Sequence, residues 1–228
     1  MHLKLRQEIL TKIYQLYDDF LKDYKIACEI KCSACCTRNV SMTALEAYRI
    51  VDYLNTEQRE DLIEKLKEAF QDKERFHPKI TTNQMADMIS QGKDLPDEGV
   101  EPLWSSCPLL VDKTCSVYEN RPFECRAFSS KINCVEEGMA DMDSTLMTAN
   151  NVFKQYIEHI DSFGVSGNMI DMLLQLKEAG NKEIYLAEDE EAAEPMIKNH
   201  PAKILMIPPG HQEKIQPVVE EFQKIKIN

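Results

Sequence analysis

Eight cysteines, gathered in two segments, are the residues of this 228-residue chain best suited to chemistry. They are Cys28, Cys32, Cys35, Cys36, Cys107, Cys115, Cys125 and Cys134. Gaps of two or three residues between cysteines let a tight turn direct two sulfurs at one centre, with metal–sulfur bonds of ~2.3 Å. We therefore predict that sulfurs from both segments bind shared metal.

The cellular compartment decides how clustered thiols are interpreted. The first eight residues include Lys4, Arg6 and Glu8, where a signal peptide would need an apolar core. We therefore expect a cytoplasmic protein, in which disulfides are rare and clustered thiols bind metal or carry out redox chemistry. A disulfide framework would require an oxidising compartment. No stretch approaches the ~18 apolar residues of a membrane span.

The donor set is all sulfur, because the five histidines lie outside the cysteine segments: His2, His77, His159, His200 and His211. Such a set selects zinc or an iron–sulfur cluster. Cys35 and Cys36 are adjacent, so their side chains point in different directions and suit two neighbouring sites, or one ligand and one spare thiol. We favour iron–sulfur, such as [4Fe–4S], because one structural zinc needs only four thiolates. Zinc stays the alternative, since two zinc sites would also use eight.

Residues around the second segment are expected to surround the metal ligands rather than to form a substrate pocket. They are Tyr118, Arg121, Pro122 and Arg126. Pro122 fixes its own backbone dihedral and so presets the turn into Cys125. The two arginines are expected to offset thiolate charge or to brace a carboxylate such as Glu119.

The cysteine motifs resemble a known family. They are CSACC at 32–36, CPLL at 107–110 and CSVYENRPFECR at 115–126. Together they resemble the CxxCxxCC cysteine-cluster family, also called the YkgJ-like, zinc- or iron-chelating domain. The family usually has two residues between its first two cysteines, whereas three separate Cys28 from Cys32. The resemblance implies metal binding. A flagellin lysine-N-methylase contains this domain, so an enzymatic role is suggested by analogy alone.

Three functions remain open at this point. The first is an iron–sulfur protein acting in electron transfer, as a sensor or as an accessory factor. The second is an S-adenosylmethionine-dependent protein methylase, and the third is a zinc-stabilised interaction module. The spacing of Cys28, Cys32 and Cys35 matches that of radical S-adenosylmethionine enzymes, but this loop follows a predicted helix and the chain lacks their strand–helix alternation. No catalytic residue is predicted, and whether the protein is an enzyme stays open.

Hydrophobic periodicity predicts a mainly α protein, a helical bundle with irregular cysteine-rich metal-binding knuckles and little or no β structure. A capping box at Thr43–Glu46 predicts a helix start. The remaining helices are expected near 9–24, 56–70, 85–89, 144–160, 170–180 and 215–222, with Gly180 ending the sixth. One short strand is expected at 204–207.

Two regions are expected in the chain: a cysteine-cluster metal-binding domain with its N-terminal helix at 1–140, and a helical C-terminal extension at 141–228 packed on it. A formal charge of −12 argues against nucleic-acid binding. Only 7 glycines, none in a run, argue against a phosphate-binding loop. The acidic run at 187–194 is expected to be a solvated face, and the sequence is compatible with a protein partner.

Overall fold

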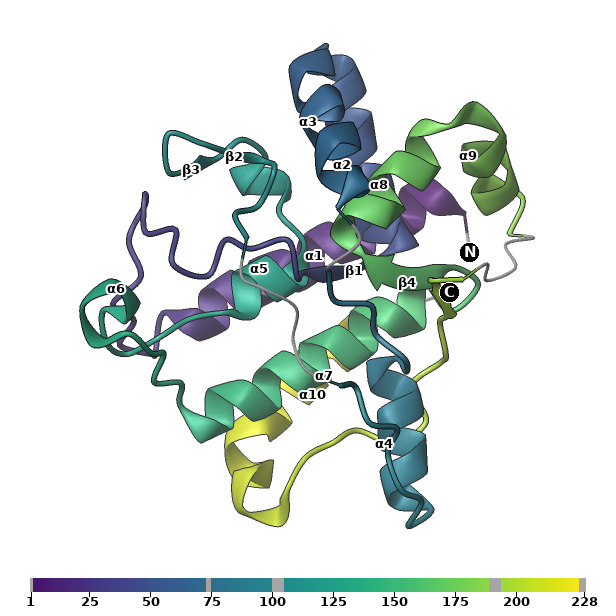
Figure 1. Ribbon diagram of the computed structural model, residues 1–228. Helices are drawn as coiled ribbons and strands as arrows, with labels where there is room; N and C mark the ends of the chain where they lie inside the picture. The colour runs from purple at the N-terminus through teal and green to yellow at the C-terminus, as the bar shows by residue number, and fades with distance from the viewer. Residues whose placement is uncertain (1, 73–74, 100–104, 189–193, 226–228) are drawn as a thin grey trace.

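The computed structural model describes residues 2–72, 75–99, 105–188 and 194–225 (Figure 1). Within these ranges it has ten α-helices: Leu3–Leu21 (α1), Ala44–Thr56 (α2), Glu60–Gln71 (α3), Thr82–Ser90 (α4), Phe123–Ala127 (α5), Cys134–Glu137 (α6), Ser144–Ile160 (α7), Met169–Lys177 (α8), Ala179–Leu186 (α9) and Gln212–Lys224 (α10). The mainly α class is therefore confirmed. None of the helices in these ranges has the length and apolar character needed to cross a membrane.

Two small antiparallel sheets accompany the helices. The first has the order β1-β4-β5 and joins three segments distant in sequence: Ser41–Thr43 (β1), Val165–Asn168 (β4) and Ile197–Lys198 (β5). The second is a hairpin of Leu110–Val111 (β2) and Thr114–Cys115 (β3). Strands of two to four residues show no usable alternation, so the sequence pattern did not indicate them.

Local signals located some helix boundaries well and others poorly. Thr43 caps α2 as predicted, and its capping box with Glu46 is present. Two predictions were wrong. Gly180 lies inside α9, and the preceding helix ends because Glu178 adopts an extended backbone. Residues 204–207 form no strand; the last strand is β5, nearer the acidic run, most of which lies outside the described residues.

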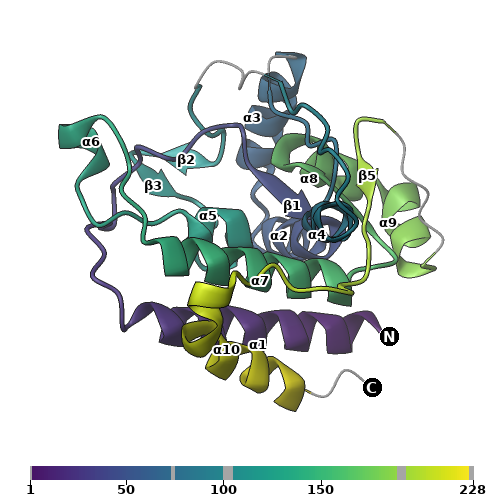
Figure 2. The same ribbon diagram turned by 90° about the horizontal axis from the view of Figure 1, so that it is seen from below.

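Helix α7 separates two hydrophobic cores (Figure 2). On one side it packs on α1 and α10, through residues such as Ile13, Phe153 and Phe222. On the other side lie α2, α3, α8 and the three-stranded sheet, with Ile50 and Leu173 in their core. Both cores thus combine residues from either side of position 140, and the division of the chain at 140 stays a prediction.

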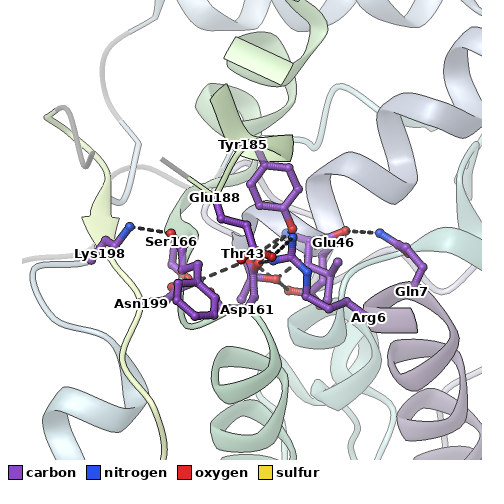
Figure 3. A network of polar contacts seen from close by, with 12 residues as sticks. Arg6, Gln7, Thr43, Glu46, Asp161, Ser166, Tyr185, Glu188, Lys198 and Asn199 are labelled. Atoms are coloured by element: carbon purple, nitrogen blue, oxygen red, sulfur yellow. Dashed lines mark hydrogen bonds and ion pairs between the residues drawn. The ribbon is translucent and has the colours of Figure 1, made fainter. Parts of the chain in front are cut away.

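A buried carboxylate at the end of α7 connects these parts (Figure 3). Asp161 is completely buried and forms an ion pair of 3.0 Å with Arg6 of α1. The same carboxylate accepts hydrogen bonds from the Leu45 N–H at 2.9 Å and from the Tyr185 hydroxyl at 2.8 Å. The Asn199 side-chain amide donates to it at 3.3 Å. Four segments are therefore fixed to one charge.

Replacement of Asp161 by Ala is expected to lower the free energy of unfolding by about 3–5 kcal/mol, because it removes the fully buried countercharge of the Arg6 guanidinium. The second ion pair of Arg6, with Glu188 at 3.5 Å, is longer and partly exposed and so compensates little. Chemical denaturation measures the change. Asp19→Ala is the matched control, since Asp19 is exposed and pairs with exposed Lys22. That control should change the free energy of unfolding by less than about 1 kcal/mol. Equal losses in the two variants would contradict the role of Asp161.

Candidate metal centre

The two cysteine-rich segments lie side by side although about seventy residues separate them in sequence. The Cys107 N–H donates to the Cys36 carbonyl at 3.0 Å, and the Arg38 N–H donates to the Ser105 carbonyl at 3.1 Å. In Figures 1 and 2 the loop before β1 runs close to the β2–β3 hairpin and to α6. The two cysteine-rich segments thus lie on one side of the molecule.

Four thiols form what we call the outer group: Cys28, Cys32, Cys35 and Cys134. Partial desolvation raises the pKa of the Cys28 thiol, and the charges of the other three members raise it further. The Ser130 N–H donates to the Cys28 sulfur and opposes this rise. Cys28 is exposed and the other three are half-buried. The charges of the other three thiols thus reach Cys28, whereas the pKa of Cys35 itself is set by its neighbour Cys36.

The remaining four thiols form the inner group: Cys36, Cys107, Cys115 and Cys125. A hydrogen bond from the Cys35 thiol lowers the pKa of Cys36, against burial and the charges of the other three inner cysteines. Donating that hydrogen bond raises the pKa of Cys35. Burial raises the pKa of Cys125, and Cys107, Cys115 and Cys35 add to the rise. Cys35 of the outer group and Cys36 of the inner group are therefore neighbours in sequence and connect the two groups.

Backbone N–H groups point at several of these sulfurs. Burial raises the pKa of Cys107 to about 12, and a hydrogen bond from the Leu109 N–H counteracts this. Burial also raises the pKa of Cys115, where the Val117 N–H and the charge of Arg121 counteract it. Donors and positive charge of this kind stabilise a thiolate relative to a thiol. The soft, all-sulfur donor set fits zinc or an iron–sulfur cluster.

All eight cysteines are free thiols in the structure. Among the residues that the structure describes, no group of three or more His, Cys, Asp or Glu side chains is arranged to hold a metal ion. Two of the histidines bind elsewhere: His77 Nε2 lies 3.1 Å from Asp171, and His159 Nδ1 accepts from the Ala202 N–H at 3.2 Å. The ligand set predicted from the sequence therefore stays a prediction.

The predicted surrounding residues form a compact turn after Cys115. Tyr118–Asn120 is a short 3₁₀ helix, and the Arg121 guanidinium lies over the Tyr118 ring at 3.8 Å. Arg121 Nη1 also donates to the Tyr118 carbonyl at 2.7 Å. Pro122, with φ of −65°, precedes α5 and so leads directly into the helix that carries Cys125.

Arg126 holds this turn together and pairs with a carboxylate as predicted, but the carboxylate is that of Asp18, 3.6 Å from Nη1, rather than that of Glu119. It is only 8% exposed, and its Nε donates to the Arg121 carbonyl at 3.1 Å. Its Nη2 donates to the backbone carbonyl of Glu119 at 2.5 Å, not to the side chain. The guanidinium also lies 4.2 Å from the Tyr14 ring centre. Arg126 thus positions the backbone that presents Arg121 near Cys115.

Glu46 supports the site and was not predicted to do so. One oxygen of its carboxylate caps α2 by accepting from the Thr43 N–H at 2.9 Å. The other accepts from the Phe123 N–H at 2.7 Å and from the Tyr14 hydroxyl at 2.8 Å. The capping box was visible in the sequence, but the second role depends on a residue 77 positions away. Glu46 therefore fixes the start of α5, two residues before Cys125.

One family matches the chain in comparisons with known proteins. The CxxCxxCC family, described as "Putative zinc- or iron-chelating domain", matches residues 27–146, which are 120 of the 228 residues and include all eight cysteines. No curated protein and no solved structure matches the chain.

Arg121→Ala is expected to weaken metal retention by about 10–100-fold, because residues that surround metal ligands typically contribute that much to affinity. The reason is the loss of a positive charge that stabilises the Cys115 thiolate. Metal content after a graded chelator challenge measures the effect. Arg59→Ala serves as control, since Arg59 pairs with neighbouring Asp61 on the surface. Equal chelator resistance of the two variants would contradict the role of Arg121.

Proposed function

The chain belongs to the CxxCxxCC family of zinc- or iron-chelating domains, and from this premise we propose that its eight cysteines hold two metal centres. The outer group forms one and the inner group the other. The observation that supports the proposal is that two adjacent cysteines, Cys35 and Cys36, interact electrostatically with different sulfurs. Cys35 influences Cys28 of the outer group, whereas the charges of Cys107, Cys115 and Cys125 act on Cys36.

Each group offers four thiols, the number that a tetrahedral zinc or a cubane iron–sulfur cluster takes. Side chains of adjacent residues diverge, so Cys35 and Cys36 serve two neighbouring centres better than one. Cys35 also influences Cys125, so the two centres would be close to each other. The peptide between Cys35 and Cys36 would then be the shortest covalent connection between them.

We favour iron–sulfur clusters over zinc. Hydrogen bonds to ligand sulfurs and nearby charge set the reduction potential of a cluster. The N–H groups of Ser130, Leu109 and Val117 and the charge of Arg121 supply both features around this donor set. When bound, such clusters supply one-electron transfer. The protein would then act as an electron carrier, sensor or accessory factor, with the exposed Cys28 side nearest to a redox partner.

Anaerobic purification followed by metal and sulfide analysis tests the identity and number of the centres. Two cubane clusters predict about eight iron and eight sulfide per chain and a brown protein that bleaches in air. About two zinc per colourless chain would retain the two centres and reject iron–sulfur. Metal sufficient for one centre alone would contradict the division of the cysteines into two groups.

Single substitutions test the division itself. Cys134→Ser and Cys107→Ser should each remove roughly half of the metal, because each disrupts one four-thiolate centre. The double variant should retain almost none. Ser33→Ala, in the same loop as Cys32 and Cys35, is the control and should retain all of it. Loss of all metal from either single variant, with the fold intact by circular dichroism, would indicate one shared centre instead.

A further inference from the structure

The most exposed large apolar side chains of the described residues lie in the segments that hold the outer group. Ile30, Val135 and Met139 are 72%, 69% and 65% exposed, and the next, Ile89, is 52% exposed. Ile30 lies within the first cysteine segment, and Val135 and Met139 come shortly after Cys134. Single exposed apolar residues are common on protein surfaces, whereas apolar residues that gather in one region mark interaction sites.

The two segments lie next to each other in space. The Ala27 N–H donates to the Ser130 carbonyl at 2.8 Å, which joins the start of one segment to the residues before the other. In Figures 1 and 2 the loop before β1 and α6 lie side by side at one edge of the molecule. We call the surface formed by residues 28–32 and 134–139 the outer face.

Local stability does not account for the two most exposed of these side chains. Ile30 lies at the tip of a turn that the Cys32 N–H closes by donating to the Glu29 carbonyl at 2.9 Å, and Lys31 in this turn has a left-handed backbone with φ of 75°. Val135 lies in the four-residue helix α6, where a β-branched side chain lowers the helix propensity. Apolar groups at both positions contact water, so a partner that covers them would gain free energy from their burial.

The region around the outer face is negatively charged. Residues 22–32 and 128–143 contain four lysines and six aspartates or glutamates. Four thiolates around a cubane cluster in its +2 state would add a net charge of about −2. The whole chain has a formal charge of −12. Electrostatic attraction therefore favours a partner with a positively charged surface.

We propose that the outer face docks a basic electron-transfer protein, whose redox group then lies next to the outer centre. The inference rests on the proposed function, because one electron passes from a reduced cluster in the outer group to the oxidised centre of the partner, with no bond made or broken. Ile30, Val135 and Met139 supply the apolar contact, and the acidic residues around them attract the partner. Electron-transfer interfaces are small and transient, which suits a face of few residues.

Two redox proteins of opposite charge test the class of partner: oxidised cytochrome c, a basic haem protein, and flavodoxin, an acidic flavoprotein. Each is titrated calorimetrically into the anaerobically purified full-length protein. Cytochrome c should bind with a micromolar dissociation constant at low ionic strength, and at least about fivefold more weakly in about 0.5 M salt, because salt screens the attraction. Flavodoxin should not bind. No binding of cytochrome c, or tighter binding of flavodoxin, would overturn the inference.

Matched variants locate the surface. Ile30→Gln and Glu137→Lys should each weaken cytochrome c binding at least about fivefold, through lost apolar burial and lost attraction respectively. The controls make the same changes at exposed positions elsewhere, Ile89→Gln on α4 and Glu68→Lys on α3, and should alter binding less than about twofold. Met139→Gln replaces Ile30→Gln if the latter loses metal. Equal effects of the variants and their controls would overturn the inference.

Electron transfer separates this inference from the proposed function. Reduced protein freed of reductant is mixed with oxidised cytochrome c, the haem absorbance is followed, and metal content is measured on the same samples. Binding that depends on the outer face without haem reduction would support the docking surface and reject the redox role. Haem reduction at equal rates in the parent protein and in Ile30→Gln would overturn the docking surface. Self-association that the same variants abolish, measured by sedimentation, would assign the face to a second copy of the chain and overturn the inference.

Discussion

A single buried carboxylate constrains the arrangement of most of this fold. A carboxylate buried away from water needs hydrogen-bond donors or a positive charge around it. Removal of its charged partner leaves an uncompensated buried charge, which strongly destabilises the folded state. Asp161 meets this requirement with Arg6 from α1, the Leu45 N–H from α2 and Asn199 from the segment after β5. Gly164 completes the packing, because a Cβ atom there would lie only 2.7 Å from the Asp161 carboxylate. Segments from both ends of the sequence are thus fixed at the end of α7.

Hydrogen bonds at the start of α2 connect Asp161 to the segment that carries Cys125. Asp161 holds the Leu45 N–H, and the next residue, Glu46, holds the Phe123 N–H at 2.7 Å. Helix α5 has five residues, too few to be stable alone, so its position depends on such contacts. Cys125 lies on α5. The scaffold therefore determines where one inner-group sulfur lies by a short series of hydrogen bonds from buried carboxylates.

Local patterns predicted the helical class and the capped start of α2, because each depends on residues close in sequence. The three-stranded sheet could not be predicted in this way. Its register pairs Ser41 with Asn168 across 127 positions, on strands too short for alternation. The proposed assignment of Cys35 and Cys36 to different cysteine groups likewise depends on residues that are distant in sequence. The prediction that Gly180 ends a helix was wrong. A glycine favours the end of a helix where the backbone becomes left-handed, and Gly180 does not adopt that conformation.

The two cysteine groups differ in how much the protein orders them before metal binds. The inner group is anchored by α5, by the β2–β3 hairpin and by the hydrogen bond from the Cys107 N–H to the Cys36 carbonyl. Most of the outer group lies in the loop before β1, which has no helix and little strand, and Cys28 is exposed there. Ordering a loop on metal binding costs conformational entropy, whereas a site that folding has already ordered loses little more. Metal at the outer group would therefore contribute more to local order, and metal at the inner group would bind a segment that the buried carboxylates already hold.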